Sequence, residues 1–319
     1  MSAPTHRNPA LGVGLVVLGA TLFIVNAGVS RVALRAGVDP VTLTTIRVTG
    51  STLVLVLFAA LFRPAALRPP GGRLAWLLVA HGLIGVAALQ WTYFVAIDRL
   101  PVGMALLLEY QAPILVAVWA RLVQKEDVRG RMWVGLALAM VGLAAATGIW
   151  RGLAFDVVGI VAGLGAAVCF ATYFLIGEHG VGLLDPLRVI LWSFLVATVA
   201  LNLVSPLTAF DTGLLDDQVS LLGRLADVYV PVWSLLLWVV LLGTLVPFAV
   251  ELAALGHLRA TTVTMIAMIE PVGVSALGWL WFYESLDAVA LVGGVAVVAG
   301  IVLAQSARRA PVLVEPPHL

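Results

Sequence analysis

Long apolar segments cover most of this 319-residue chain, and ten of them can each span a bilayer as a helix. They run approximately over residues 10–30, 40–62, 74–97, 101–122, 131–149, 157–178, 186–206, 232–256, 260–283 and 287–306. Only 11% of the residues are charged, against about 25% in a soluble domain, so lipid must cover much of the surface. Lipid admits only helices or closed barrels, and these runs do not alternate as barrel strands do. The sequence therefore predicts an all-α integral membrane protein with ten transmembrane helices.

The chain also repeats itself at a constant spacing. Residues 100–146 align without a gap on residues 258–304, which lie 158 positions later. The aligned pairs of identical type include Pro113 with Pro271, Glu126 with Glu284, Gly135 with Gly293 and Gly142 with Gly300. Duplicated membrane bundles are typical of transporters, so we expect two five-helix repeats, residues 12–149 and 157–306.

The distribution of Lys and Arg predicts the orientation. With the N-terminus inside, 12 of the 18 Lys and Arg residues fall at inner helix ends, so the positive-inside rule places both termini in the cytoplasm. A five-helix repeat has an odd number of spans, so the second repeat enters the membrane from the opposite side. We therefore expect inverted-topology repeats, which can exchange inward-open and outward-open states. Residues 307–319 contain three prolines and are expected to form a disordered cytoplasmic tail.

Equivalent segments of the two repeats carry a likeness to a known family. They are Ala112-Pro113-Ile114-Leu115 through Gln124-Lys125-Glu126 with the Gly135 and Gly142 helix, and Glu270-Pro271-Val272 through Tyr283-Glu284-Ser285-Leu286 with the Gly293 and Gly300 helix. On these residues the chain resembles the EamA family of the drug/metabolite transporter superfamily, over residues 10–306. The resemblance implies ten helices, inverted repeats and the movement of small metabolites, often outward, without naming the cargo.

Three charged residues fall in the middle of predicted membrane helices, where a charge costs about 2.5–3.5 kcal/mol. They are Arg47, Glu109 and Glu270. Arg47 resembles the arginine that the family carries in its second helix, and Ser193 replaces it in the second repeat. In repeat coordinates Glu109 and Glu270 differ by three residues, nearly one helical turn, so we expect both on a similar face of equivalent helices. That face is predicted to line a central cavity.

Two interpretations of these acids stay open. Glu109 or Glu270 can hold a proton, which would couple transport to protons, or can pair with a cationic group of the substrate. Alternatively, one of them forms a structural ion pair with Arg47. Glu251 is expected to reach water near the inner end of its helix, and His81 is expected to be a packing residue.

Two prolines interrupt equivalent helices. Pro113 and Pro271 each remove a backbone hydrogen bond and free a carbonyl four residues earlier. These kinks either act as hinges or are static. Polar and aromatic residues are predicted at a similar depth as candidates for substrate contact, namely Asn26, Gln90, Trp91, Tyr93, Tyr110, Gln111 and Tyr173.

Small residues form a stripe on the last helix of each repeat. The stripes are Gly135-Ala139-Gly142-Ala146 and Gly293-Val297-Gly300-Ala304, and their helical spacing allows close helix approach. We interpret both as scaffold helices, and a homodimer seam along them stays open as an alternative.

Composition argues against several functions. The net charge of +1 gives no basic face for nucleic acid, the single Cys169 and scattered histidines give no metal site, and the sequence has no phosphate-binding loop. No cofactor is expected, and the chain is not expected to be an enzyme. The expected partners are a small-molecule substrate and the lipid bilayer.

The leading hypothesis is a secondary transporter that exports small metabolites, such as amino acids or related compounds, across the plasma membrane of a bacterium. The main alternative is a multidrug exporter for cationic compounds, which buried acids and aromatic side chains would favour. More remote alternatives are an integral-membrane enzyme and a non-transporting scaffold.

Overall fold

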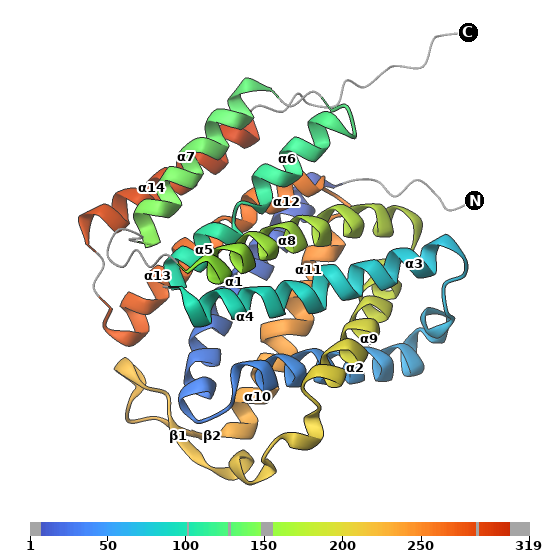
Figure 1. The fold of residues 1–319 in the computed structure, drawn as a ribbon, viewed down its shortest axis with the longest axis vertical. Helices are drawn as coiled ribbons and strands as arrows, with labels where there is room; N and C mark the ends of the chain where they lie inside the picture. The colour runs from blue at the N-terminus through green and yellow to red at the C-terminus, as the bar shows by residue number, and fades with distance from the viewer. Residues whose placement is uncertain (1–7, 101, 127–128, 148–155, 285–286, 307–319) are drawn as a thin grey trace.

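The computed structural model describes residues 8–100, 102–126, 129–147, 156–284 and 287–306. Within these residues the chain is a bundle of helices, with one two-stranded hairpin at an end of the bundle (Figure 1). The expected tail, residues 307–319, lies outside the described residues. So do residues 148 and 149 of the first expected repeat, and Ser285 and Leu286 of the family-like segment.

The helical elements follow the predicted apolar runs. In the first half they are α1 (Pro9–Arg35), α2 (Pro40–Phe62), α3 (Arg73–Ala80), α4 (Leu89–Arg99), α5 (Val102–Glu109), α6 (Ala112–Leu122) and α7 (Gly130–Thr147). In the second half they are α8 (Val157–Leu183), α9 (Pro186–Val204), α10 (Val232–Val240), α11 (Val246–Ala254), α12 (Ala260–Ala267), α13 (Ile269–Phe282) and α14 (Ala288–Ser306).

Several consecutive elements join into longer rods. Within the described residues, 8 helical stretches are long and apolar enough to cross a membrane. Two shorter apolar helices, Gly130–Ala146 and Ala288–Ala304, accompany them. The expected helical membrane architecture is confirmed at this level.

Aspartates begin three of these helices. Oδ2 of Asp39 accepts two backbone N–H groups of the first turn of α2, both at 3.0 Å, and Oδ1 of Asp185 accepts one in α9 at 2.9 Å. In both helices a proline follows the aspartate. Proline has no backbone N–H, and at the first position of a helix that N–H would have no partner within the helix. Asp156 caps α8, and the hydrogen bond from the backbone N–H of Gly159 lowers the pKa of the Asp156 carboxyl.

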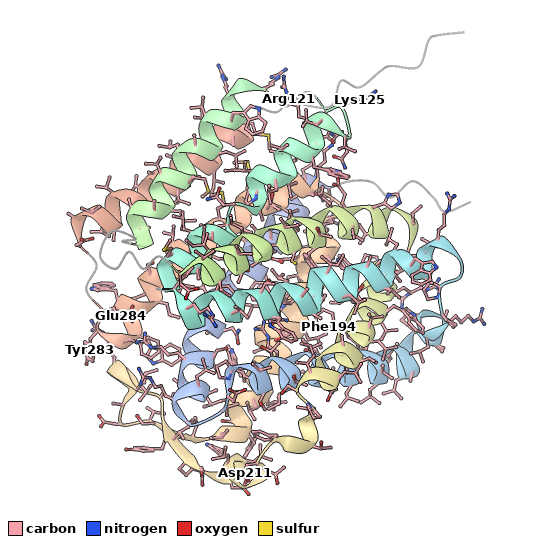
Figure 2. The ribbon with its side chains drawn as sticks, viewed as in Figure 1. Arg121, Lys125, Phe194, Asp211, Tyr283 and Glu284 are labelled. Atoms are coloured by element: carbon pink, nitrogen blue, oxygen red, sulfur yellow. The ribbon has the colours of Figure 1, made fainter. Side chains whose placement is uncertain are left out.

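The helices that end before the two repeated glutamates share one geometry. Lys125 and Tyr283 both have left-handed backbone, with φ of 56° and 57°. The N–H groups of Glu126 and Glu284 then bond to the carbonyls six residues back, at 2.9 Å and 3.1 Å, and close the helix ends. Figure 2 shows Lys125 and Tyr283 at opposite ends of the bundle. Equivalent helix ends therefore lie on opposite sides of the molecule.

Four of the expected helices contain an interruption. The π-helical segments His81–Ala88 and Leu241–Leu245 continue the helix between α3 and α4 and between α10 and α11. Turns at Tyr110–Gln111 and at Met268 separate α5 from α6 and α12 from α13. The two predicted kink prolines follow these turns. Such irregular backbone is tolerated in a membrane where protein, not lipid, takes the freed backbone groups.

α7 and α14 lie side by side along one edge of the bundle (Figure 1). A Cβ atom on Gly135 would stand 2.6 Å from Gly300 O, and one on Gly142 would stand 2.6 Å from Gly293 O. Side-chain carbons do not approach an oxygen so closely, so this helix separation requires glycine. The two small-residue stripes face each other, antiparallel, within a single chain. Each stripe, which was the alternative location for a homodimer seam, is therefore covered by the other helix of the same chain.

The long connection after α9 contains a short sheet that the all-α prediction missed. β1 (Gln218–Ser220) pairs antiparallel with β2 (Tyr229–Pro231), and the pair is drawn beside the start of α10 in Figure 1. The connection also contacts α13, because Trp281 Nε1 donates a hydrogen bond to Leu221 O at 3.0 Å. Strand pairing outside the apolar runs leaves no signal in hydropathy, which explains the miss.

His81 packs in the interior, in the π-helical segment that it begins. It is 1% exposed, and its Nδ1 lies 2.7 Å from Ser193 Oγ while its Nε2 lies 3.1 Å from Tyr173 O. The carbonyl can only accept, so Nε2 donates and Nδ1 accepts the serine hydroxyl. The ring also stacks on Tyr173, with centroids 4.8 Å apart. Ser193, which replaces Arg47 in the repeat alignment, therefore donates a hydrogen bond to a histidine of the first half.

Replacing Lys125 with glycine is expected to stabilise the protein by about 1 kcal/mol, because a β-carbon disfavours left-handed backbone by roughly that amount. Lys125 is exposed, so few contacts are lost. Thermal unfolding of the purified protein in detergent measures the effect. Lys125→Ala is the control because it keeps the β-carbon. Equal unfolding midpoints for the glycine and alanine variants would contradict this explanation.

Replacing Ser193 with alanine is expected to lower stability by about 1–3 kcal/mol, because Nδ1 of His81 then stays buried without a partner. The matched control is Ser275→Ala, whose hydroxyl bonds only to a carbonyl of its own helix, Pro271 O, at 2.9 Å. The same unfolding measurement applies. A loss as large for Ser275→Ala as for Ser193→Ala would argue against the role given to the His81 contact.

Candidate functional site

Three glutamates gather where the interrupted helices meet. Glu109 ends α5, Glu251 lies in α11 and Glu270 lies in α13. Tyr110 donates a hydrogen bond from its hydroxyl to Glu270 Oε2 at 2.9 Å. The Glu270 carboxyl also interacts electrostatically with those of Glu109 and Glu251. These four residues, called the acidic cluster below, connect the first half of the chain to the second.

The helix breaks explain how the cluster forms. Glu109 is the last residue of α5 and Glu270 is the second residue of α13, so both stand next to a break. At the first break, Gln111 Nε2 donates to Leu107 O at 3.2 Å and so satisfies a carbonyl near the end of α5. The structure brings Glu109, Tyr110 and Glu270 together, while the Gln111 amide is used by its own helix.

Arg47 is held by neutral groups at the second π-helical segment. Its Nε donates to Thr244 Oγ1 at 2.9 Å, and its Nη2 donates to Gly243 O at 3.4 Å. Thr244 is fully buried and donates in turn to Val239 O at 2.7 Å. A π-helical turn leaves backbone carbonyls outside the regular ladder, and here one of them binds the guanidinium.

The ion pairs among the described residues join Arg47 to neither Glu109 nor Glu270. Tyr93 lies between them instead, close enough to interact electrostatically with both Arg47 and Glu109. Arg47, Thr244 and Gly243 thus form a separate group, called the Arg47 group below, and Tyr93 connects it to the acidic cluster.

Asn26 belongs to the Arg47 group. It is 5% exposed, and its amide lies directly against Gly243, where a Cβ atom would overlap it. Its Oδ1 has no hydrogen-bond partner within the described part of the chain. Asn26 therefore brings a free acceptor to the place where Arg47 meets the π-helical turn.

The remaining candidates differ in their environments. Tyr173 is 1% exposed, and its hydroxyl lies 3.5 Å from Phe248 O. Gln90 is 7% exposed, and its Nε2 lacks a partner among the described residues. Trp91 is 49% exposed and does not share the burial of its neighbour. Burial therefore sets Tyr173 and Gln90 apart from Trp91 as interior residues.

Three phenylalanines that the sequence does not single out, Phe170, Phe174 and Phe248, extend the group of aromatic rings around the candidates Tyr110 and Tyr173. Phe170 contacts the Tyr110 ring edge to face, at 5.9 Å between centroids, and Phe174 follows it at 4.9 Å. Tyr173 and Phe248 continue the series at 5.5 Å. Isolated phenylalanines in apolar runs look like any other core residue, so their sequence positions gave no signal. Together the rings form an aromatic wall next to Tyr110.

Glu251 corrects an expectation. It was expected to reach water near the end of its helix, yet it is 2% exposed and faces the interior. Its Cγ would lie 3.0 Å from a Cβ atom on Gly19, so α1 closes over it. The direction in which Glu251 points depends on helix register, and the π-helical segment before it alters that register.

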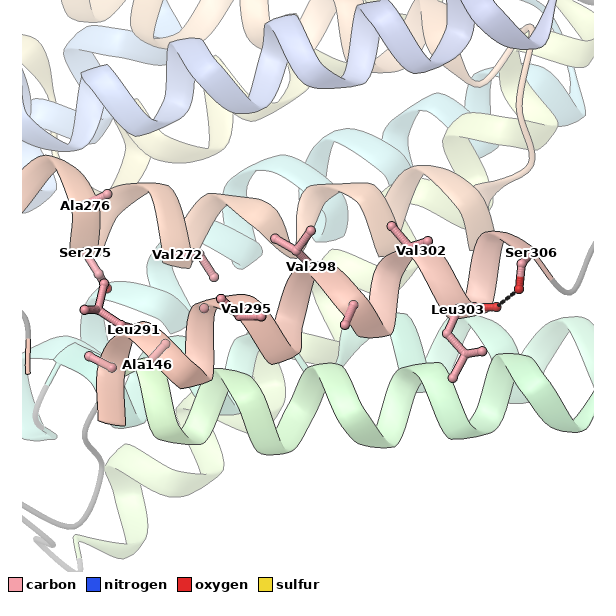
Figure 3. A pocket seen from close by; sticks show the side chains of 13 residues that line it. Ala146, Val272, Ser275, Ala276, Leu291, Val295, Val298, Val302, Leu303 and Ser306 are labelled. Atoms are coloured by element: carbon pink, nitrogen blue, oxygen red, sulfur yellow. Dashed lines mark hydrogen bonds between the residues drawn. The ribbon is translucent and has the colours of Figure 1, made fainter. Parts of the chain in front are cut away.

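A groove of ≈ 730 Å³ lies along α13 and α14, away from these polar residues (Figure 3). Its walls are almost entirely apolar, with Val272, Val295 and Val298 among them. The hydroxyls of Ser275 and Ser306 are bound to carbonyls of their own helices. None of the acidic cluster lines the groove. It suits hydrocarbon rather than a charged metabolite.

α12 and α13 form one helical stretch, called the α12–α13 rod below, and an ion pair lies at each of its two ends. Arg31 Nη1 pairs with Glu284 Oε1 at 2.5 Å, and its guanidinium stacks 4.4 Å from the centre of the Phe282 ring. Arg259 pairs with Glu126 before the start of α12. Three of these side chains are about half exposed and Glu126 is 24% exposed, so solvent screens both pairs and each contributes about 1 kcal/mol at most. Both pairs join the first half to the second.

No group of three or more His, Cys, Asp or Glu side chains arranged for a metal ion occurs in the described ranges. The described interior presents carboxyl, hydroxyl, amide and guanidinium groups beside aromatic rings.

Known proteins resemble this chain over most of its length. Threonine/homoserine exporters RhtA of Salmonella typhimurium and Escherichia coli are 25% identical over 260 residues, which is 80% of this chain and 78% of each relative. An uncharacterized transporter of Archaeoglobus fulgidus is 26% identical over 229 residues, 70% of this chain and 75% of that protein. A crystal structure of a protein with 17% identity superposes with a TM-score of 0.72 over 92% of this chain and 96% of that one, and so supports the fold.

The family comparison covers both halves. The sequence model of the EamA-like transporter family matches residues 10–148 and again residues 157–305. The resemblance seen in the proline, glutamate and glycine segments is thereby confirmed. The chain belongs to the EamA-like transporter family of membrane proteins.

Proposed function

We propose that this protein is a secondary transporter that exports small metabolites, amino acids or related compounds, across the plasma membrane by alternating access. The observation that carries the proposal is the hydrogen bond between Tyr110 and Glu270, which joins two helix breaks from opposite halves of an EamA-like transporter chain. Broken helices that meet near the middle of a bundle are where transporters of this general design bind their substrates.

Inverted repeats with ten crossings are part of the proposal. The equivalent residues Lys125 and Tyr283 have the same left-handed backbone and lie at opposite ends of the bundle (Figure 2). The π-helical segments also fall at equivalent positions, with Gly85 and Gly243 separated by the same 158 residues. A Cβ atom on Gly85 would meet Tyr173, and one on Gly243 would meet Asn26, so each segment packs on the opposite half. These paired features support two halves related by inversion.

The ion pairs at the two ends support alternating access. Arg31 with Glu284 holds one end of the α12–α13 rod, and Arg259 with Glu126 holds the other. Opening either side of the protein requires one of them to separate, which costs little because solvent reaches and screens both pairs. The breaks before Pro113 and Pro271 are the proposed hinges between those ends.

The proposed substrate carries both charges. The named exporters among the relatives act on threonine and homoserine, according to their names, and an amino acid needs a partner for its ammonium and one for its carboxylate. The acidic cluster is the proposed partner of the ammonium group. Arg47, with Asn26 beside it, is the proposed partner of the carboxylate.

A second candidate is export of cationic compounds. The aromatic wall of Phe170, Phe174, Tyr173 and Phe248 next to three glutamates favours it, because ring faces attract organic cations. Such a substrate would use the acids and the rings but would have no use for Arg47. The dependence of transport on Arg47 therefore separates the two candidates.

Counterflow in proteoliposomes tests the proposal. Vesicles loaded with unlabelled threonine or homoserine should accumulate the same labelled amino acid in a saturable way, and vesicles loaded with an unlabelled organic cation are tested in parallel with that cation as the labelled tracer. Glu109→Gln should lower the initial rate by about 10-fold or more, since a charge-assisted contact is worth about 1.5–3 kcal/mol. Asp216→Asn, which removes an exposed loop carboxylate, is the matched control and should leave the rate unchanged.

The outcomes distinguish the candidates. Exchange of amino acids that is lost in Arg47→Ala supports the amino-acid proposal. Exchange of organic cations that survives in Arg47→Ala supports the second candidate. A folded protein that exchanges neither class would contradict both.

A further inference from the structure

Glu251 is the most enclosed glutamate of the acidic cluster. It is 2% exposed, and the close crossing of α1 at Gly19 leaves room for it and little else. Its carboxyl interacts directly with that of Glu270 on α13. Two carboxyl groups from different helices therefore lie side by side inside the bundle.

This pair is short of hydrogen-bond donors. Glu270 Oε2 accepts the Tyr110 hydroxyl, but Glu270 Oε1 and Glu251 Oε1 have no partner within the described ranges of the chain. Both of these oxygens are buried. An ionised carboxylate only accepts hydrogen bonds, and a buried acceptor left unpaired costs about 1–3 kcal/mol.

The missing donor has to bring a positive charge. Two carboxylates side by side repel each other, and a proton shared between them removes one of the two charges. An ammonium group supplies three N–H donors together with its charge. Water would supply donors but would leave both negative charges uncompensated.

Among the described residues, no ion pair reaches Glu251 or Glu270. The titratable groups nearest the pair are Glu109 of α5, Tyr110, Cys169, Tyr173, Glu178 and His179 of α8, Arg188 of α9, Arg47 of α2, and His81. The other arginines on the elements that pack against α11 and α13 are exposed, namely Arg31 and Arg35 of α1, Arg131 of α7 and Arg224 of the Gly223–Leu225 turn. Of the nearest groups, Tyr110 and Tyr173 interact with Glu251, and Glu109 interacts with Glu270. α1 has no titratable side chain from Pro9 to Ser30, and α12 has none. Arg47 is held by Thr244 and Gly243 instead.

We propose that Glu251 and Glu270 form one site for a single positive charge, taken in turn by a proton and by the ammonium group of the substrate. This assignment deepens the proposed function and rests on it. Tyr110 orients Glu270 through its hydrogen bond, and Tyr173, whose ring packs on Phe248, lies close enough to Glu251 to interact with it electrostatically. Glu251, which hydropathy places near the membrane surface, becomes a binding residue.

Exchange at this site balances in charge and in atoms. When an ammonium group enters, the shared O–H bond breaks, the electron pair stays on the carboxyl oxygen and the proton passes to water. The site holds one positive charge before and after. Amine movement in one direction therefore requires proton movement in the other.

Proton release measures this exchange directly. Purified full-length protein in weakly buffered detergent with a pH indicator is titrated with n-butylammonium, and separately with L-homoserine. Wild type should release about one proton per chain at saturation, as one shared proton per carboxyl pair requires. Glu251→Gln should release none, while Asp216→Asn, the loop control, should behave as wild type.

Two results would overturn the assignment. One is binding of butylammonium, followed by calorimetry, with no proton released or with the same release from Glu251→Gln. The other is absence of butylammonium binding at millimolar concentration. If the glutamine variant does not fold, Glu251→Asp and Glu270→Asp keep a carboxyl and should move the pH midpoint of proton release, whereas an unmoved midpoint in both counts against the site.

Counterflow of amino acids with the same preparation keeps the two proposals separate. Normal exchange together with no proton release removes the carboxyl-pair site and leaves the proposed function standing. Proton release that depends on Glu251, without amino-acid exchange, keeps the site and removes the proposed cargo.

Discussion

Lipid cannot hydrogen-bond to a peptide group, and this constraint decides where the irregular backbone of the protein lies. Each interruption of a membrane helix needs a partner from the protein for the groups that it frees. Arg47 reaches Gly243 O in one π-helical segment, and the Gln111 amide binds Leu107 O at the break after α5. His81, in the other π-helical segment, instead donates to a carbonyl of the neighbouring helix α8, Tyr173 O. For this reason, polar side chains occur at the interruptions. The acids at the breaks before the two prolines are therefore part of a wider pattern, in which departures from helical geometry and the polar chemistry of the interior occur together.

The same pattern ties the halves to each other. Gly85 lies against Tyr173 of the second half, where a β-carbon would make a tight 3.0 Å contact, and Gly243 lies against Asn26 of the first half, whose amide a β-carbon would overlap. Each π-helical segment therefore packs against a helix from the other half. An exchange of conformations between the halves has to move both contacts together, because each half supplies one glycine and one polar partner. Close helix approach at glycine, rather than broad apolar burial, provides the specificity that lipid cannot provide.

Hydropathy and repeat spacing were enough to predict the helices, the scaffold stripes and the two broken rods, because these features depend on composition along one helix. The helix starts at Asp39-Pro40 and Asp185-Pro186 are likewise local, since capping involves only the first turn of each helix. Glu251 could not be placed in this way. Its direction depends on the π-helical register of Leu241–Leu245, and its burial depends on Gly19 in a distant helix. The hairpin at Gln218–Ser220 and the aromatic wall likewise depend on contacts between segments that no single apolar run reveals.

The charges of the interior are distributed unequally, and this has a functional consequence. Arg47 is held by a threonine hydroxyl and a backbone carbonyl, so its positive charge does not compensate the acids across Tyr93. In the second half the equivalent position is Ser193, which binds His81 and carries no charge. A symmetric arrangement would place a cation in both halves, able to neutralise the glutamates permanently. Because Arg47 is bound elsewhere, the proposed site at Glu251 and Glu270 is left without a permanent cation from Arg47, as the proposed exchange of a proton for an ammonium group requires.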